Sequence, residues 1–245
     1  MTQPAITVVD DYEALSKTAA EVIAEILTRT PSAKVVAATG ETPMGVYREL
    51  ARCRDHGTFD PSSMTVFVLD EYVGAPDGNP RSLADWLRRA FVEPLGISDD
   101  RVIGLPEDGS PGACAAYDRA LGESGGFDLA ILGIGTNGHI GFNEPPSEAW
   151  APTRLVELSQ ESLASNQRYR EDGVPVPGRA VTVGMVPLLA SRACVLLASG
   201  SSKADILRQA MRGPVGPHLP ASFLQEHGNL TVIADRAAWP GQENA

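Results

Sequence analysis

Basic residues are too few in this chain to suggest a nucleic-acid partner. The 245 residues include 31 acidic and 20 basic side chains, which gives a formal net charge of -11. No segment gathers Lys or Arg into a stripe that would follow a phosphate backbone. We therefore expect no nucleic acid to bind, whereas a small anionic substrate would need local donors that act against the overall negative field.

Cysteine is scarce as well, and long apolar runs are missing. Cys53, Cys114 and Cys194 are an odd, widely spaced set, which suits reduced thiols better than a disulfide framework or a zinc site. No apolar run approaches the roughly 20 residues that span a bilayer. The N-terminal residues also lack the basic and apolar regions of a secretory signal, so we expect a cytoplasmic protein without a membrane contact.

Apolar strands alternate with amphipathic helices along most of the chain. A hydrophobic content of 43% is enough for a sizeable core, and we expect residues 1–245 to form one domain. The alternation predicts an α/β fold in which helices cover both faces of a mostly parallel sheet. The predicted strands are Ile6–Val9, Lys34–Ala38, Thr65–Leu69, a short one near Val102, Leu129–Leu132, Ala193–Ala198 and Leu230–Ala234, and the predicted helices are Asp11–Leu27, Met44–Cys53, Leu83–Phe91, Ala113–Leu121 and Lys203–Met211.

The segment from Ser159 to Arg179 interrupts this alternation. It is polar at first and then rich in glycine and proline. Long irregular segments in compact domains often serve as lids over a site. We therefore expect residues 159–179 to form a mobile lid.

The segment Asp128–Pro145 is the most informative part of the sequence, because a buried strand ends there in glycines and then delivers His139 and Glu144. Glycines permit backbone turns that a side chain would obstruct, and open α/β sheets bind ligands at the carboxyl ends of their strands. His139 and Glu144 are therefore candidates for a proton relay. The alternative is a loop histidine that bonds only to backbone, and the surrounding glycines favour the functional interpretation.

Two other strand-to-helix loops carry candidate anion ligands. Thr39-Gly40-Glu41-Thr42 places hydroxyl and backbone N–H groups at a helix N-terminus, where the helix dipole favours a phosphate. The motif is weak by itself, because an ordinary helix start would look the same. Lys203, in a later loop of the same kind, would add a point charge if the two strands are neighbours. Alone, it would more often be a solvated surface lysine.

Asp70 and Glu71 follow the third predicted strand. Because successive strand residues point to opposite sides, one carboxylate would face the cleft as a base while the other points away. A helix cap is an equally good interpretation of either residue. A metal site has little support, since His139 has no second histidine at helical spacing, and a serine nucleophile has none, since no Gly-x-Ser-x-Gly elbow is present.

Five motifs follow one another along the chain. They are Thr39-Gly-Glu-Thr-Pro-Met44, Leu69-Asp-Glu-Tyr-Val73, Gly135-Thr-Asn-Gly-His-Ile-Gly-Phe-Asn-Glu-Pro145, Thr182-Val-Gly184 and Gly200-Ser-Ser-Lys203. Taken together and in order, they resemble those of the glucosamine-6-phosphate deaminase family, which is related to the 6-phosphogluconolactonases. The resemblance covers nearly the whole chain and implies a modified Rossmann-like sheet and no metal or organic cofactor. It implies conversion of glucosamine 6-phosphate to fructose 6-phosphate and ammonia.

The resemblance also implies a role for individual residues. Asp70 matches the base that moves a proton between sugar C2 and C1, and His139, assisted by Glu144, matches the ring-opening catalyst. Ring opening must come first, because only the open sugar has a carbonyl that makes its C2 proton acidic. The matching phosphate ligands come from three loops and are Thr39, Gly40, Thr42, Arg168 and Lys203.

This sequence departs from the family pattern at two site positions. Asn137 stands where many members have Asp, and it cannot carry the charge that would orient His139. Asn137 can still hydrogen-bond the ring, so we expect altered ring opening or pH dependence. Glu41 stands where a small residue is common, and its charge near a phosphate is unfavourable unless it points to solvent.

A third departure concerns regulation. Members that are activated by N-acetylglucosamine 6-phosphate carry basic residues after the Asn-Glu-Pro motif. Arg154 matches one of them, but Val156 replaces a lysine and Glu148 replaces a serine. We expect no strong allosteric activation.

Alternatives remain open for the substrate. No feature reads the orientation of the C4 hydroxyl, so galactosamine 6-phosphate would serve as well. A lactonase is less favoured, because Asp70 has no task in simple ester hydrolysis. A non-catalytic sugar-phosphate sensor would need a DNA-binding region, which is missing. We expect a sugar phosphate as the partner, and a homo-oligomer is compatible with the sequence.

Overall fold

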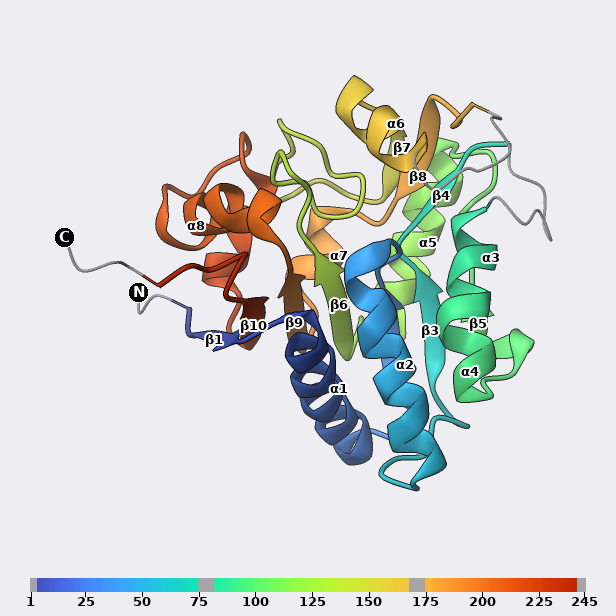
Figure 1. Cartoon of the computed structure of the whole chain (residues 1–245). Helices are drawn as coiled ribbons and strands as arrows, with labels where there is room; N and C mark the ends of the chain where they lie inside the picture. The colour runs from blue at the N-terminus through green and yellow to red at the C-terminus, as the bar shows by residue number, and fades with distance from the viewer. Residues whose placement is uncertain (1–3, 75–81, 168–174, 242–245) are drawn as a thin grey trace.

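A parallel sheet of seven strands forms the centre of the molecule (Figure 1). The computed structural model describes residues 4–74, 82–167 and 175–241. The strands lie in the order β1-β10-β9-β6-β2-β3-β5, and every neighbouring pair is parallel. They are β1 (Ile6–Val9), β2 (Lys34–Ala37), β3 (Thr65–Val68), β5 (Val102–Ile103), β6 (Leu129–Gly133), β9 (Ala193–Ala198) and β10 (Leu230–Asp235). The mostly parallel single-domain α/β fold is therefore confirmed, and all the predicted strands are present.

Helices cover both faces of this sheet. Alternate strand residues serve the two layers: Val35 and Ala37 of β2 pack into one hydrophobic core, and Val36 and Ala38 pack into the other. One layer contains α1 (Tyr12–Arg29), α2 (Glu41–Asp55), α3 (Leu83–Leu87), the π-helical turn η1 (Arg88–Val92) and α4 (Glu93–Leu95). The other contains α5 (Pro111–Glu123), α7 (Met185–Leu189), α8 (Ala204–Arg212) and the 3-10 segment η4 (Pro220–Glu226). In Figure 1, α1 and α2 lie in front of the sheet and α5 lies behind it.

Local sequence explains why the helices begin and pack as they do. The Asp11 side chain accepts a hydrogen bond of 2.9 Å from the backbone N–H of Ala14 and so caps α1. Leu15, Ile23 and Leu27 then form its buried stripe. None of the helices within residues 4–74, 82–167 and 175–241 has both the length and the apolar character needed to cross a bilayer.

A second, antiparallel sheet lies beside the carboxyl end of β3. It consists of β4 (Asp70–Tyr72), β8 (Arg179–Thr182) and β7 (Arg154–Glu157), in the order β4-β8-β7. The strand pattern did not predict this sheet, because its strands are short and pair with distant partners. Its register places Asp70 opposite Thr182, so the sheet fixes the first carboxylate of the Asp-Glu-Tyr motif.

The expected lid segment contains a helix. Within residues 159–179 the structure has α6 (Gln160–Gln167) and the first residue of β8, and residues 168–174 lie outside the described part. Figure 1 shows α6 above the carboxyl ends of the central strands. The same edge holds the segments that follow β2, β6 and β9, which are adjacent strands. The predicted site residues come from these segments, except Asp70, which lies in β4, and Arg168, which lies outside the described residues.

Candidate active site

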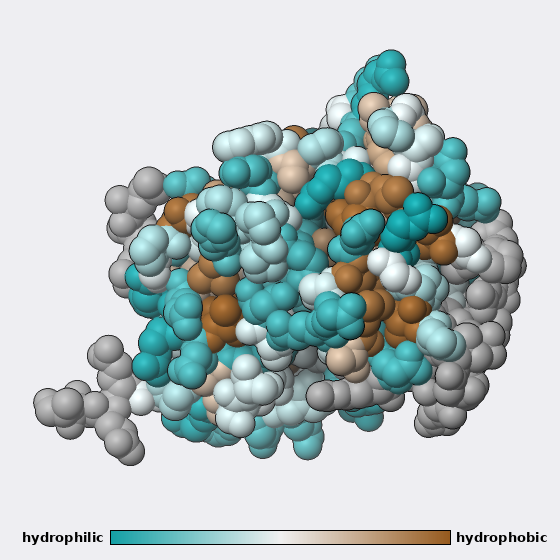
Figure 2. Space-filling view, turned by 90° about the horizontal axis from the view of Figure 1, so that it is seen from above, coloured by the Kyte–Doolittle hydropathy of each residue, from teal (hydrophilic) through white to brown (hydrophobic). Residues whose placement is uncertain are grey.

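An open cavity of about 170 Å³ lies at the carboxyl edge of the sheet. Seen from that side, hydrophilic side chains cover much of the middle of this face, between apolar patches (Figure 2). Most of the site residues predicted from the sequence line the cavity: Thr39, Gly40, Glu41, Thr42, Asp70, His139 and Lys203. Asn137 and Glu144 lie next to His139. Arg168 lies outside the described residues and stays a prediction.

The first turn of α2 forms one end of the cavity. Gly40 is the residue before the helix and has a φ of 102°, a left-handed conformation that favours glycine. The backbone N–H groups of a first helical turn have no partner within the helix, and no side chain caps this one. The Tyr12 hydroxyl donates to the carbonyl of Glu41 at 2.9 Å and accepts from the N–H of Gly45 at 2.8 Å. This turn is therefore held in place and suited to an anion.

Lys203 and Glu41 set the charge at this end. Lys203 ends the 3-10 segment η3 (Ser201–Lys203) after β9 and is half-buried. Burial lowers the pKa of its ammonium, and the charge of Glu161 partly opposes that shift. Glu41 is exposed and borders a second surface hollow beside Tyr12 and Arg48. Because water surrounds it, its charge weakens anion binding less than a buried carboxylate would.

The two acidic residues of β4 have different roles. Glu71 accepts hydrogen bonds from the backbone N–H groups of Leu83 at 3.0 Å and Ala84 at 2.8 Å, so it caps the start of α3. Asp70 faces the cavity, is 5% exposed, and its Oδ1 has no hydrogen-bond partner among the described residues. Burial, with a smaller contribution from the charge of Glu71, raises the pKa of Asp70 to about 7. A carboxyl group in this state can take up and return a proton near neutral pH.

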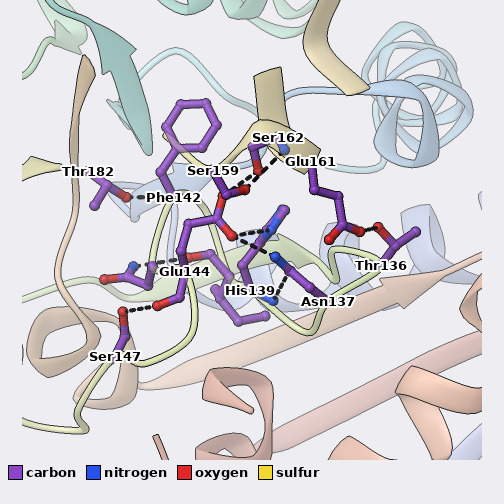
Figure 3. A network of polar contacts seen from close by, with 12 residues as sticks. Thr136, Asn137, His139, Phe142, Glu144, Ser147, Ser159, Glu161, Ser162 and Thr182 are labelled. Atoms are coloured by element: carbon purple, nitrogen blue, oxygen red, sulfur yellow. Dashed lines mark hydrogen bonds and ion pairs between the residues drawn. The ribbon is translucent and has the colours of Figure 1, made fainter. Parts of the chain in front are cut away.

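His139 and Glu144 form a second titratable group on the loop after β6. His139 Nδ1 lies 3.3 Å from Oε2 of Glu144 (Figure 3), a contact whose alignment is too poor for a well-formed hydrogen bond. A Cβ atom on Gly135 would lie 2.3 Å from the imidazole, so only glycine fits beneath this ring. Burial opposes ionisation of Glu144, but the nearby His139 and the hydrogen bonds from Ser162 and Asn137 outweigh it and lower the pKa of Glu144 to about 2.

Asn137 contacts Glu144 rather than the imidazole ring. Its amide nitrogen donates to Oε2 of Glu144 at 2.7 Å, and its Oδ1 accepts from the backbone N–H of His139 at 3.1 Å. The expected bond to the ring is therefore replaced by a bond to the ring's acidic neighbour. An ionised aspartate could not donate in this way. Asparagine at this position therefore supplies Glu144 with a hydrogen bond that the family's aspartate would not.

Arg154 braces the same loop from β7. Its guanidinium donates to Oδ1 of Asn143 at 2.7 Å and to Oγ of Ser147 at 3.0 Å, and Ser147 donates to the carbonyl of Glu144 at 2.6 Å. Asn143 is fully buried and donates to the carbonyls of Ile140 and Val183. The arginine thus fixes the backbone around Glu144 instead of projecting freely to an anion.

Three contacts to this loop were missed in the sequence. Ser159 and Ser162 donate to Glu144, and Thr136 donates to the carboxylate of Glu161. All three bonds join the loop to α6 or to the residue before it (Figure 3). Serine and threonine are ordinary in a polar surface segment, so composition gave no signal, and only the docking of α6 over the cavity reveals these contacts. No group of three His, Cys, Asp or Glu side chains that would hold a metal occurs within the described ranges.

Comparison with known proteins agrees with this site. Residues 10–233 match the family model described as glucosamine-6-phosphate isomerases/6-phosphogluconolactonase. A glucosamine-6-phosphate deaminase of Streptomyces coelicolor is 43% identical over 238 residues, which cover 95% of this chain and 90% of the relative. One of Cutibacterium acnes is 42% identical over 236 residues, with the same coverage of both chains.

Solved structures give the same result. A monomeric glucosamine-6-phosphate deaminase aligns with a TM-score of 0.90 and 33% identity, covering 95% of this chain and 98% of the other. The 6-phosphogluconolactonase of Trypanosoma brucei has a TM-score of 0.71 at 20% identity, with 97% and 98% covered, and shares the fold. The chain belongs to the glucosamine-6-phosphate isomerase/6-phosphogluconolactonase family.

Proposed function

We propose that this protein converts glucosamine 6-phosphate and water to fructose 6-phosphate and ammonia. One observation carries the proposal. Asp70, a buried carboxyl group whose Oδ1 has no hydrogen-bond partner among the described residues, lines the same cavity as His139, which lies against Glu144, and the other end of that cavity suits a phosphate. Lactone hydrolysis needs no base that moves a proton between adjacent carbons. The names of the similar deaminases agree with this choice.

The reaction begins with ring opening. His139 accepts the proton of the C1 hydroxyl and supplies one to the ring oxygen, while the ionised Glu144 stabilises the imidazolium that forms in between. The separation of 3.3 Å between His139 Nδ1 and Glu144 Oε2 permits this stabilisation. The product is an open sugar with a C1 aldehyde.

Asp70 then carries out the isomerisation. Its ionised form removes the C2 proton, and the resulting carboxylic acid returns a proton to C1. The aldehyde oxygen takes up a proton and the C2 ammonium loses one, which leaves a C1 hydroxymethyl group and an iminium at C2. Water adds to this iminium and ammonia leaves, which yields fructose 6-phosphate. A base whose pKa is about 7 exists in both protonation states at neutral pH and so can complete both transfers.

The first turn of α2 and Lys203 hold the phosphate. Backbone N–H groups and one ammonium at short range outweigh the distant surface charges, which salt screens. The predicted contact from Arg168 would add a second cation. This end of the cavity anchors the substrate so that C1 and C2 lie between Asp70 and His139.

Product analysis tests the proposal. The purified protein is incubated separately with glucosamine 6-phosphate, galactosamine 6-phosphate and 6-phosphogluconolactone, and ammonia and ketose phosphate are measured. We expect equal amounts of ammonia and fructose 6-phosphate from the first substrate. Release of ammonia from galactosamine 6-phosphate alone would show that this compound is the substrate instead of glucosamine 6-phosphate. Lactone hydrolysis without ammonia from either amino sugar would refute the proposal.

The rate should show no strong activation by N-acetylglucosamine 6-phosphate. Arg154, which matches a basic residue of activated relatives, already donates to Asn143 and Ser147, and Glu148 adds a carboxylate nearby in the chain. The rate should therefore rise hyperbolically with substrate, with or without this compound. A sigmoidal curve that the compound makes hyperbolic would contradict the prediction.

A further inference from the structure

The helix that borders the cavity is bonded to the ring-opening pair. Ser159 Oγ donates to Oε1 of Glu144 at 3.0 Å, and the hydroxyl of Ser162 donates to the same oxygen. Ser162 lies in α6, and Ser159 is the residue before the helix. Figure 3 shows the two hydroxyls on one side of the Glu144 carboxylate and the side chains of His139 and Asn137 on the other.

The two oxygens of Glu144 have separate partners. Oε1 receives the two serine hydroxyls, and Oε2 receives Asn137 at 2.7 Å and faces His139 Nδ1 at 3.3 Å. An ionised carboxylate offers about four lone-pair positions, and the hydrogen bonds from Ser159, Ser162 and Asn137 fill most of them. The serine side therefore fixes the rotation of the carboxylate, and with it the position of the oxygen that faces the imidazole.

Ser162 is the more informative of the two serines. It is 1% exposed, so water cannot readily replace its hydroxyl. Ser159 has an additional task, because its Oγ accepts from the backbone N–H of Ser162 at 3.1 Å and so caps α6. Loss of the Ser159 hydroxyl would weaken the helix as well as the contact to Glu144. Ser162, which also lines the cavity, has no capping role, so loss of its hydroxyl removes a donor to the carboxylate and leaves the helix start intact.

We propose that Ser162, together with Ser159, is a positioning residue for His139: the hydroxyls of the helix that covers the cavity orient Glu144 toward the ring-opening histidine. The proposal rests on the proposed function. Without these donors, burial would raise the pKa of Glu144, and nothing on the serine side would stop the carboxylate from rotating away from His139 Nδ1. The α6 segment and the His139–Glu144 pair are thus joined by direct hydrogen bonds.

Ser162→Ala tests the proposal through two measurements. The first is the titration of Glu144 in protein with ¹³C-labelled side-chain carboxyls, whose midpoint should move upward in the variant. The second is kcat on glucosamine 6-phosphate relative to kcat on an analogue that lacks the ring-forming hydroxyls. We expect this ratio to fall about 10-fold, as for the loss of one hydrogen bond to a charged group, with little change in KM. Ser162→Thr, which retains the hydroxyl, should restore most of both values.

Two control variants separate positioning from general damage. Thr136→Val removes the bond between the loop and Glu161 but no donor to Glu144, so the Glu144 titration should stay unchanged. Ser191→Ala removes a hydroxyl from a serine that is 6% exposed and lies against His227, away from the cavity, and should change neither measurement. Folded Ser162→Ala protein with an unchanged titration, or with an unchanged ratio of rates, would overturn the proposal.

The proposed function is tested separately by ammonia release from the unaltered protein. The Glu144 titration needs no turnover, so a failure of positioning and a failure of the proposed reaction give different results.

Discussion

Two carboxyl groups of the site differ in their surroundings and in their pKa. Asp70 of β4 lines the cavity, and Glu144, on the loop after β6, lies against His139, which lines it. Asp70 has an oxygen with no partner in the described structure, whereas Glu144 receives donors on both of its oxygens. Burial raises the pKa of Asp70 to about 7. Burial also opposes ionisation of Glu144, which is less buried than Asp70, but its hydrogen bonds and the neighbouring His139 outweigh that effect and lower its pKa to about 2.

The comparison shows that the depth of burial and the number of donors together decide the task of each carboxyl group. A group with a raised pKa can exchange a proton at neutral pH, and a group held ionised can only orient and stabilise a neighbouring cation. Asp70 therefore suits the base at C2, and Glu144 suits the partner of His139.

The largest effect should come from Asp70→Asn. This change removes the group that we propose moves the proton between C2 and C1, so kcat should fall about 10³-fold or more. Binding of a sugar phosphate should change little, because the anion end is untouched. Steady-state rates and calorimetric binding measure the two effects, and turnover that persists would show that the base is another residue.

The two carboxyl groups should also have opposite effects on the free energy of unfolding as the pH changes. The folded pKa of Asp70 is raised, so its stabilising effect is present below the unfolded pKa of about 4 and is lost as pH rises to about 7. Asp70→Asn should therefore increase the free energy of unfolding at pH 8, by at most about 4 kcal/mol. Glu144 has a lowered pKa, so its contribution is present above about pH 4.5 and is lost as pH falls toward 2.

Denaturant unfolding at pH 8 measures both changes. Glu144→Gln should destabilise the protein there, in the direction opposite to Asp70→Asn. Destabilisation by both substitutions would remove the distinction between the two groups.

His139→Gln should reduce kcat on the cyclic substrate about 100-fold, since general acid–base catalysis of ring opening is lost. An analogue that lacks the ring-forming hydroxyls should lose much less, because it does not need this step. Parallel assays of the two substrates decide the matter. An equal loss on both would place His139 outside ring opening.

The smallest effect should follow Asn137→Asp. The new residue cannot donate to Oε2 of Glu144 when ionised, and its like charge raises the pKa of Glu144. The rate on the cyclic substrate should change by less than about 10-fold, since the serine donors remain. Carboxyl titration by NMR checks the shift, and an unmoved Glu144 would show that the 2.7 Å contact of Asn137 does not control its charge.

The central sheet could be predicted from the sequence because its strands are continuous apolar runs. Residues such as Leu129–Leu132 are buried on both faces, which leaves a clear signal. The antiparallel sheet could not, because β4 has three residues and pairs with a strand more than a hundred positions away. Such pairing depends on tertiary packing and not on local pattern.

The site residues could be predicted where ionisable side chains directly follow an apolar strand. Asp70 and Glu71 were expected to point to opposite sides, and the structure assigns one to the cavity and the other to a helix cap. The partners of Glu144 were not predictable, because Ser159 and Ser162 reach it only through the docking of α6. The contact of Asn137 with Glu144 likewise depends on loop geometry that spacing does not reveal.

The central claim is tested most directly by titration of the two carboxyl groups in the unaltered protein. Protein labelled with ¹³C at the Asp and Glu carboxyls is followed by NMR from pH 2 to 9, and the signals are assigned by their loss in Asp70→Asn and Glu144→Gln. We predict a midpoint of about 7 for Asp70 and of about 2 for Glu144. An Asp70 midpoint close to the ordinary value of 3.8 would contradict the assignment of base and orienting carboxylate.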